Sequence, residues 1–293
     1  MPGSLRFDAP SALDYFATLV VDDGSLPLIE AAASIAQDDY PQLDVQAVLA
    51  DIDRLAAKLK RRIAHDAAPL QRLRLLNRYF FQELAFGGNV NDYYDTDNSY
   101  LHAVLASRRG IPITLATLYI ELATQIGLPA QGVSFPGHFL IKLRLPQGRQ
   151  QGEVVIDPFT GQSLSRDELG ELLMPYRRQH GLPADAELPL GMFLQAASPR
   201  DVVARMLRNL KEIHRSGDDW PRLLAVQRRL VVLLPRDWEE RRDRGLTLAA
   251  LGHAGEAADD LAAYLAHRPE AEDRRMLSDR LDELRRAAPP RLH

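Results

Sequence analysis

The chain has 293 residues, of which 46% are hydrophobic and 26% are charged, a composition typical of a globular protein with two domains or one large one. The net charge of −4 excludes an overall basic field that would attract nucleic acid or anionic lipid. There is no cysteine, which excludes disulfides, thiolate metal sites and thiol nucleophiles.

Residues 1–10 contain no apolar core of the kind that secretory signal peptides carry. No uninterrupted apolar run approaches the ~18 residues of a membrane-spanning helix. We therefore expect a cytoplasmic protein with no membrane partner and no nucleic-acid partner.

Residues 10–85 show apolar side chains at intervals of three and four, which predicts a helical N-terminal part. The predicted helices cover residues 12–21, 26–36, 45–65 and 70–84. Residues 87–98 are rich in Gly, Asn and Asp and are predicted to form a polar loop. Ser99 is the predicted N-cap of a helix over residues 100–108.

Residues 112–126 are predicted to form the central helix of the chain. Pro112 suits the first helical position, where its missing N–H is no loss, and Gly127 suits the position after the C-terminus. Apolar side chains make one wide stripe, which predicts burial: Leu115, Ala116, Leu118, Tyr119, Ile120, Leu122 and Ala123.

Three strands are predicted to follow, over residues 131–135, 138–145 and 153–157. Pro136 and Gly137 form a turn between the first two, and residues 148–152 form a polar hairpin loop between the last two. Connections this short permit only antiparallel pairs, so we expect a small antiparallel sheet packed on the helix 112–126. A helix over 165–173 and a linker over 176–195 complete this part.

From about residue 199 the chain is again helical, with nearly equal numbers of cationic and acidic side chains, as on a solvated surface. Pro235 and Pro269 are 34 residues apart, the period of tetratricopeptide repeats. Small and apolar residues between them fall where such a repeat needs them: Gly245, Leu248, Gly252, Ala257 and Leu261. We expect four or five antiparallel helices over 200–286, a degenerate repeat at 202–235, and close helix contact at Gly245 and Ala257.

The order of elements in residues 109–159 indicates a particular chemistry. A helix N-terminus, a strand carrying His138 and a strand ending in Asp157 follow one another, as in papain-like and transglutaminase-like enzymes. In such sites the helix N-terminus activates a nucleophile, the His acts as base and the Asp orients the His. Because a hairpin joins the two strands, we expect His138 and Asp157 to lie within hydrogen-bond distance.

Several short stretches together resemble the SirB1 family of bacterial proteins: residues 93–95, 98–99, 109–115, 135–140, 156–159 and 242–245. The resemblance covers roughly residues 10–270. It implies an α+β fold, in which a papain/transglutaminase-like core with a small antiparallel sheet is followed by an all-helical tetratricopeptide-like tail. The expected domains are 1–195, with a helical part 10–85 and a core 86–175, and 196–293. The name of that family refers to a suggested regulatory link to invasion genes.

The resemblance also assigns roles to residues of the site. His138 and Asp157 match two members of the catalytic triad, whereas Pro112 occupies the position of the catalytic cysteine. Proline has no nucleophilic atom, so the two remaining residues are interpreted as a remnant dyad. Thr114 lies about 200° further around the helix and is expected to bond to nearby backbone, because residues advance ~100° each. Ser99 and Ser134 remain open as replacement nucleophiles.

Further residues could line a binding groove beside His138: Tyr93, Tyr94, Asp95, Asn98 and Phe135. The alternative for the tyrosines is simple packing over the core, and the alternative for His138 and Asp157 is a buried polar pair. Two protein ligands are too few for a firm metal site, so no metal and no cofactor is expected.

Three functions fit these observations. The first is a non-enzymatic regulatory protein that binds a peptide or protein, with the repeats as a second interaction surface. The second is a hydrolase or acyltransferase that uses His138 and Asp157 with a non-cysteine nucleophile or water. The third is a scaffold without a ligand. The sequence leaves the partner and the oligomeric state open.

Overall fold

The computed structural model describes residues 10–147, 150–183 and 188–287, which fold as two compact units. The core unit contains Pro27–Ala36 and Gln42–Met206. The tail unit contains the described parts of Met1–Leu26, Gln37–Pro41 and Leu207–His293. These units differ from the expected domains 1–195 and 196–293. Two N-terminal segments belong with the tail, and the boundary falls between Met206 and Leu207, inside the helix α10 (Pro199–Ser216).

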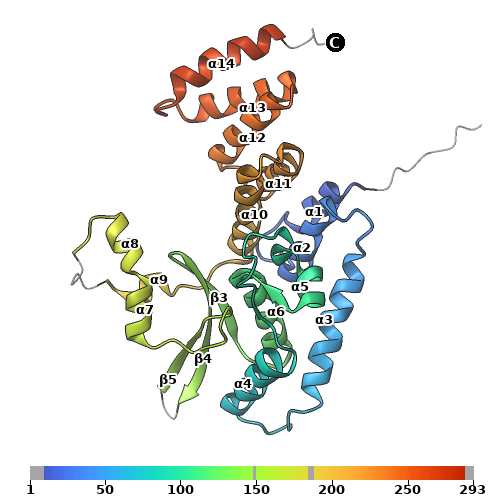
Figure 1. The fold of residues 1–293 in the computed structure, drawn as a ribbon, viewed down its shortest axis with the longest axis vertical. Helices are drawn as coiled ribbons and strands as arrows, with labels where there is room; N and C mark the ends of the chain where they lie inside the picture. The colour runs from blue at the N-terminus through green and yellow to red at the C-terminus, as the bar shows by residue number, and fades with distance from the viewer. Residues whose placement is uncertain (1–9, 148–149, 184–187, 288–293) are drawn as a thin grey trace, which may run out of the picture. The chain divides into compact units, whose positions relative to one another are not determined.

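The core unit is an α+β structure, as expected (Figure 1). Its helices are α2 (Leu28–Ser34), α3 (Val45–Lys60), α4 (Pro69–Asn77), α5 (Leu101–Ser107), α6 (Pro112–Gln125), α7 (Arg166–Leu172), α8 (Met174–Gln179) and α9 (Leu190–Phe193). The π-helix Arg78–Glu83 and the 3-10 helix Thr96–Ser99 add single turns. The short strands β1 (Gly87–Gly88) and β2 (Arg109–Gly110) pair in parallel, and β3 (Ala130–Phe135), β4 (His138–Gln147) and β5 (Gln150–Ile156) form an antiparallel sheet.

The two faces of the three-stranded sheet are covered by different elements. Figure 1 shows α6 on one side of the sheet and α7 to α9 on the other. On the α6 side, a Cβ on Gly132 would lie 2.7 Å from the ring of Phe139 and 3.6 Å from Ile120, so glycine is needed for this close packing. On the other side, Val133, Leu140 and Val155 join apolar residues of α7 and of the segment around α9 in one buried cluster.

α6 is the most completely buried helix of the core unit, as its wide apolar stripe predicted. Every residue from Ile113 to Tyr119 is buried. The helix begins at Pro112, and Gly127 follows it with φ of 75°, a conformation that glycine adopts without steric cost. Both predicted helix boundaries are thereby confirmed to within one residue.

Other predicted boundaries need correction. Ser99 does not cap α5: it ends the 3-10 helix, and Tyr100 is the N-cap. The predicted helix 70–84 is an α-helix that continues as a π-helix. The predicted hairpin loop is shorter than expected, because Gln150–Ile156 is already strand, and the predicted linker contains α8 and α9. Residues 148–149 and 184–187 lie outside the described residues.

The tail unit contains the first helix of the chain, α1 (Ala12–Leu19), and five consecutive helices, as the repeat pattern predicted. These are α10 (Pro199–Ser216), which begins in the core unit, α11 (Trp220–Leu233), α12 (Trp238–Ala250), α13 (Ala254–His267) and α14 (Arg274–Ala287). Leu248, Ala257 and Leu261 lie in a buried cluster that also contains Leu277 and Leu281 of α14.

An ion pair inside the tail unit joins segments that are 191 residues apart. The fully buried guanidinium of Arg229 on α11 donates two hydrogen bonds to the carboxylate of Asp38, at 2.6 and 2.9 Å. It also lies 5.0 Å from the centre of the Phe16 ring of α1. A bidentate pair of this kind fixes geometry as well as energy, and it explains why the N-terminal segments belong to this unit.

The contact between α12 and α13 depends on small residues, as predicted. A Cβ on Gly245 would lie 3.0 Å from Leu261 and 3.2 Å from Asp260. Ala257 is fully buried. Asp260 is also buried and accepts two hydrogen bonds from Arg244, at 2.6 and 2.7 Å. The two helices therefore have no room for larger side chains at these positions.

We predict that Ala257→Leu lowers the free energy of unfolding by ~1–3 kcal/mol, because extra methyl groups overpack this contact. Urea unfolding followed by circular dichroism measures the change. The same substitution at the exposed Ala250, near the end of α12, is the matched control and should change the value by less than ~0.5 kcal/mol. Equal midpoints for the two variants would contradict the repeat packing.

Candidate functional site

The N-terminus of α6 is set by a close approach of backbone to neighbouring side chains. A Cβ on Gly110 would lie 2.8 Å from the hydroxyl of Thr114 and 3.0 Å from Val104, so only glycine fits. Ile111 is extended, with φ of −90° and ψ of 163°, and Pro112 then begins the helix. Pro112 is partly exposed and offers no nucleophilic atom at this position.

Two of the candidate hydroxyls, those of Thr114 and Ser134, are poorly placed to replace the nucleophile. Thr114 is fully buried, and its hydroxyl bonds to the carbonyl oxygens of Asn98 (2.7 Å) and Ile111 (3.0 Å). This confirms the predicted bonding of Thr114 to nearby backbone. Ser134 is exposed on β3, and strand alternation places it on the face opposite to Phe135. Ser99 is buried, and its Oγ has no hydrogen-bond partner in the described structure.

The turn between β3 and β4 places His138. Phe135 and His138 are opposite each other across the hairpin, with Pro136 and Gly137 between them. Gly137 has φ of 70°, and a Pro followed by a Gly with positive φ is the pattern of a type II turn. His138 is the first residue of β4 and is only partly exposed.

The register of β4 with β5 brings Asp157 to the same face as His138. Ile141 pairs with Ile156, the residue before Asp157. Continuing this register by one residue places Asp157 opposite Leu140, two residues from His138 along β4. Residues two apart on a strand share a face, so the two polar side chains are diagonal neighbours on one side of the sheet.

The predicted hydrogen bond between His138 and Asp157 is not formed. Among the residues that the structure describes, no hydrogen bond or ion pair joins the two side chains. The carboxylate of Asp157 instead accepts hydrogen bonds from the backbone N–H of Phe159 (2.8 Å) and the hydroxyl of Thr160 (3.0 Å). Asp157 ends its strand and begins a turn, which the N–H of Gly161 closes on the Asp157 carbonyl at 2.8 Å. The carboxylate is therefore held by its own turn.

His138 still responds to nearby charges. Burial lowers the pKa of His138, the charge of Asp157 opposes this, and the charge of Arg205 lowers the pKa further. The net shift is downward, so the imidazole is neutral near pH 7 and can accept a proton.

Arg205 is a site residue that the sequence analysis missed. It lies on the part of α10 that belongs to the core unit, and its guanidinium donates to the carbonyl oxygen of Phe135 at 3.5 Å. The guanidinium also lies 5.5 Å from the centre of the Phe139 ring. Burial lowers the pKa of Arg205, and Tyr93 opposes this shift. No local motif marks this arginine, because only the folded chain brings it to His138.

Tyr93 belongs to the same group of side chains. Burial raises the pKa of Tyr93, Tyr94 adds to this, and Arg205 opposes it. The Tyr93 ring lies 6.1 Å from that of Phe159 and 5.4 Å from that of Tyr94. Tyr94 is 74% exposed and Tyr93 is 46% exposed, so both rings reach solvent and Tyr93 has the larger covered fraction.

The other predicted binding residues have structural contacts. Asn98 is buried, and its amide donates to the carbonyl oxygens of Asp92 (2.6 Å) and Tyr93 (3.2 Å), which holds the loop that carries the tyrosines. Asp95 accepts a hydrogen bond from the N–H of Asp97 at 3.0 Å and caps a 3-10 helix. The Phe135 ring is buried. The backbone carbonyl oxygen of Phe135 accepts the hydrogen bond from Arg205.

The polar loop is tied to the site by a strand pair that was not predicted. Gly87 and Gly88 pair in parallel with Arg109 and Gly110, directly before α6. The N–H of Gly88 donates to the carbonyl of Phe159 at 2.9 Å, and a Cβ on Gly88 would lie 2.2 Å from the Phe159 ring. The glycines thus let three segments meet: the tyrosine loop, the start of α6 and the turn after Asp157.

The arrangement combines a neutral imidazole, a carboxylate, a guanidinium and a phenol. These groups can donate and accept hydrogen bonds with the amide and carboxylate groups of a peptide. In the described parts of the chain, no group of three His, Asp or Glu side chains is placed to hold a metal ion. No helix in those parts is long and apolar enough to cross a membrane.

Comparison with known proteins gives two family matches. Residues 46–208 match the family model for the transglutaminase-like superfamily, and residues 210–282 match a tetratricopeptide repeat model. The boundary between the two matches lies close to the boundary of the core unit at Met206.

Relatives of similar length support the same assignment. The chain is 37% identical over 265 residues to a UPF0162 protein of Xylella fastidiosa (strain Temecula1 / ATCC 700964), covering 90% of this chain and 92% of the relative. A UPF0162 protein of Vibrio cholerae is 25% identical over 272 residues, covering 93% of this chain and 97% of the relative.

A shorter match is also found: a segment of 72 residues is 44% identical to F-box only protein 21 of Homo sapiens, covering 25% of this chain and 12% of the relative. No solved structure gives a significant match. The chain therefore belongs to the UPF0162 (SirB1-like) family, in which a transglutaminase-like domain precedes a tetratricopeptide repeat region.

Proposed function

We propose that this protein is a non-enzymatic regulatory protein of the bacterial cytoplasm, and that its transglutaminase-like domain binds a peptide or protein segment beside His138. The observation that carries the proposal is the start of α6. Pro112 stands where the family resemblance places the catalytic cysteine, and the hydroxyl of Thr114 is bonded to backbone. Acyl transfer through a covalent intermediate needs a nucleophile, and this position supplies none.

The side chains that remain suit binding. Arg205 and His138 present polar groups next to Tyr93, whose ring is half exposed. Partly buried aromatic and arginine side chains are the residues that contribute most to protein interfaces. Because Phe159 and Asn98 fix the loop of Tyr93, the contact surface is largely ordered before a partner binds.

The tail offers a second interaction surface, because tetratricopeptide-like helices stack into extended arrays. Its charges support a protein partner over a nucleic acid. Lys211 bridges Glu240 and Asp243, at 2.5 and 2.6 Å, and Arg208 pairs with Asp237 at 2.7 Å. Cations that are paired in this way are not free to bind phosphates.

Pro112→Cys tests the inherited geometry, because it gives the chain a single thiol. The family resemblance implies that this helix N-terminus faces His138, and there the pKa of that thiol should fall below the ordinary ~8.5. We expect alkylation by iodoacetamide at pH 7 to be about tenfold faster than for a free thiol, since the thiolate fraction rises while its nucleophilicity falls only partly.

Ser134→Cys is the matched control, because it places a single exposed thiol on the same sheet but on the other face from His138. The double variant Pro112→Cys/His138→Ala should react at the slower rate of that control. If Pro112→Cys reacts no faster than Ser134→Cys, the helix start and the histidine do not form a remnant site.

A second candidate function is hydrolysis with His138 as general base for water. The lowered pKa of His138 favours it, because the imidazole is then unprotonated at neutral pH. General-base catalysis by one histidine is typically worth only ~10²–10⁴-fold, so this candidate predicts slow turnover.

The purified natural chain decides between the two functions. We expect no transglutaminase, amidase or peptidase turnover above background on glutamine-containing peptides, measured by ammonia release and by mass spectrometry. His138→Gln should give the same trace. Turnover by the natural chain that is lost in His138→Gln would contradict the non-enzymatic proposal and establish the hydrolase.

A further inference from the structure

We propose that a pocket between α3 and α5 of the core unit binds a phosphate dianion, either free or as the monoester of a small molecule. The pocket encloses about 280 Å³, close to the lower size of small-ligand sites. Its lining residues are Asp51, Arg54, Leu55, Lys58, His102, Leu105, Ala106 and Arg108. The proposed peptide site uses none of them.

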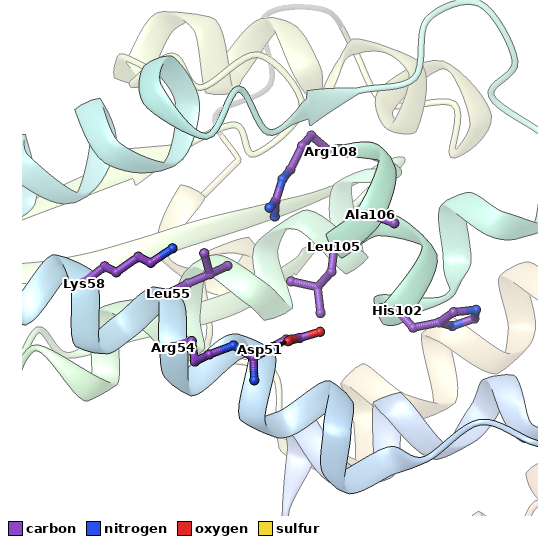
Figure 2. A pocket seen from close by; sticks show the side chains of 8 residues that line it. All are labelled: Asp51, Arg54, Leu55, Lys58, His102, Leu105, Ala106 and Arg108. Atoms are coloured by element: carbon purple, nitrogen blue, oxygen red, sulfur yellow. Dashed lines mark ion pairs between the residues drawn. The ribbon is translucent and has the colours of Figure 1, made fainter.

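Arg108 is the residue that points to a ligand. Figure 2 shows its side chain leaving the end of α5 and extending toward α3, into the space that the pocket encloses. The nitrogen Nη1 is buried and has no hydrogen-bond partner in the described structure. A buried, charged donor without a partner destabilises the folded chain unless a ligand satisfies it.

The position of Arg108 adds to this argument. Arg108 has φ of 64°, in the left-handed region that a non-glycine residue seldom adopts. Its guanidinium lies 4.6 Å from the centre of the Phe86 ring, which holds the side chain in place without neutralising it. Among the described residues, no carboxylate pairs with Arg108. The charge is therefore fixed in position and uncompensated.

The charges around the pocket match a dianion. Three cationic side chains line it, Arg54, Lys58 and Arg108, against the single carboxylate of Asp51. Asp51 forms its ion pair with Arg54, and no ion pair of Lys58 occurs in the described parts of the chain. The remaining charge is close to +2, and a phosphate monoester carries about −1.5 to −2 at pH 7.

The geometry also suits phosphate. In Figure 2 the side chain of Lys58 on α3 lies beside Leu55, and the side chain of Arg108, which directly follows α5, extends toward α3. Two like charges that line one pocket repel each other, and an anion between them turns repulsion into attraction. The guanidinium can donate two hydrogen bonds to phosphate oxygens, and the ammonium adds a point charge. Leu55 and Leu105 give the pocket apolar walls that limit competition from water.

Isothermal titration calorimetry with inorganic phosphate and with glycerol 3-phosphate tests the proposal, with sodium chloride holding the ionic strength constant. We expect saturable binding of phosphate to the full chain. Tighter binding of glycerol 3-phosphate would identify a monoester as the ligand, and equal or weaker binding would identify free phosphate. Absence of saturable heat with both probes would overturn the proposal.

Lys58→Gln and Arg108→Gln should each weaken phosphate binding about tenfold or more, since each removes a charge-assisted contact. Arg74→Gln is the matched control, because Arg74 is an exposed cation on α4 outside the pocket, and it should leave the affinity unchanged. Lys58 is exposed, so its variant keeps the test decisive even if Arg108→Gln folds poorly. Affinities for Lys58→Gln equal to those of the control would contradict the assignment.

Discussion

β4 pairs with β3 through Phe135 and His138 and with β5 through Ile141 and Ile156, and the site depends on this double register. A slip of one residue between β4 and β5 would move His138 and Asp157 to opposite faces of the sheet, and a slip between β3 and β4 would separate His138 from Phe135. The register is fixed because one face packs on α6 and the other on the cluster that includes Leu140. The buried core of this unit therefore holds the polar residues together without a hydrogen bond between them.

The same packing supports the proposal that a catalytic arrangement persists here as a binding arrangement. Packing determines where α6 begins. Gly110 allows the close approach of Thr114, and the helix that follows is buried. Pro112 suits the first position of this helix as well as a nucleophile would. The charges of Asp157 and Arg205 still shift the pKa of the His138 imidazole, whether or not a reaction occurs.

The sequence was sufficient for features that depend on local signals. The proline and glycine at the ends of α6, the Pro–Gly turn before His138 and the small residues of α12 and α13 predicted the corresponding structure. Features that depend on distant contacts could not be found in this way. Arg205 reaches Phe135 across 70 residues and Arg229 reaches Asp38 across 191. The predicted His138–Asp157 hydrogen bond is absent from the described structure, in which the Asp157 carboxylate accepts from two donors of its own turn.

Asp157 and Arg205 both act on the pKa of His138: the carboxylate raises it and the guanidinium lowers it. Imidazole NMR titration of His138 in the natural chain, in Asp157→Asn and in Arg205→Gln measures this directly. We expect a pKa of His138 below the ordinary ~6.5, a further decrease in Asp157→Asn and an increase in Arg205→Gln. A pKa at the ordinary value that neither substitution changes would contradict it.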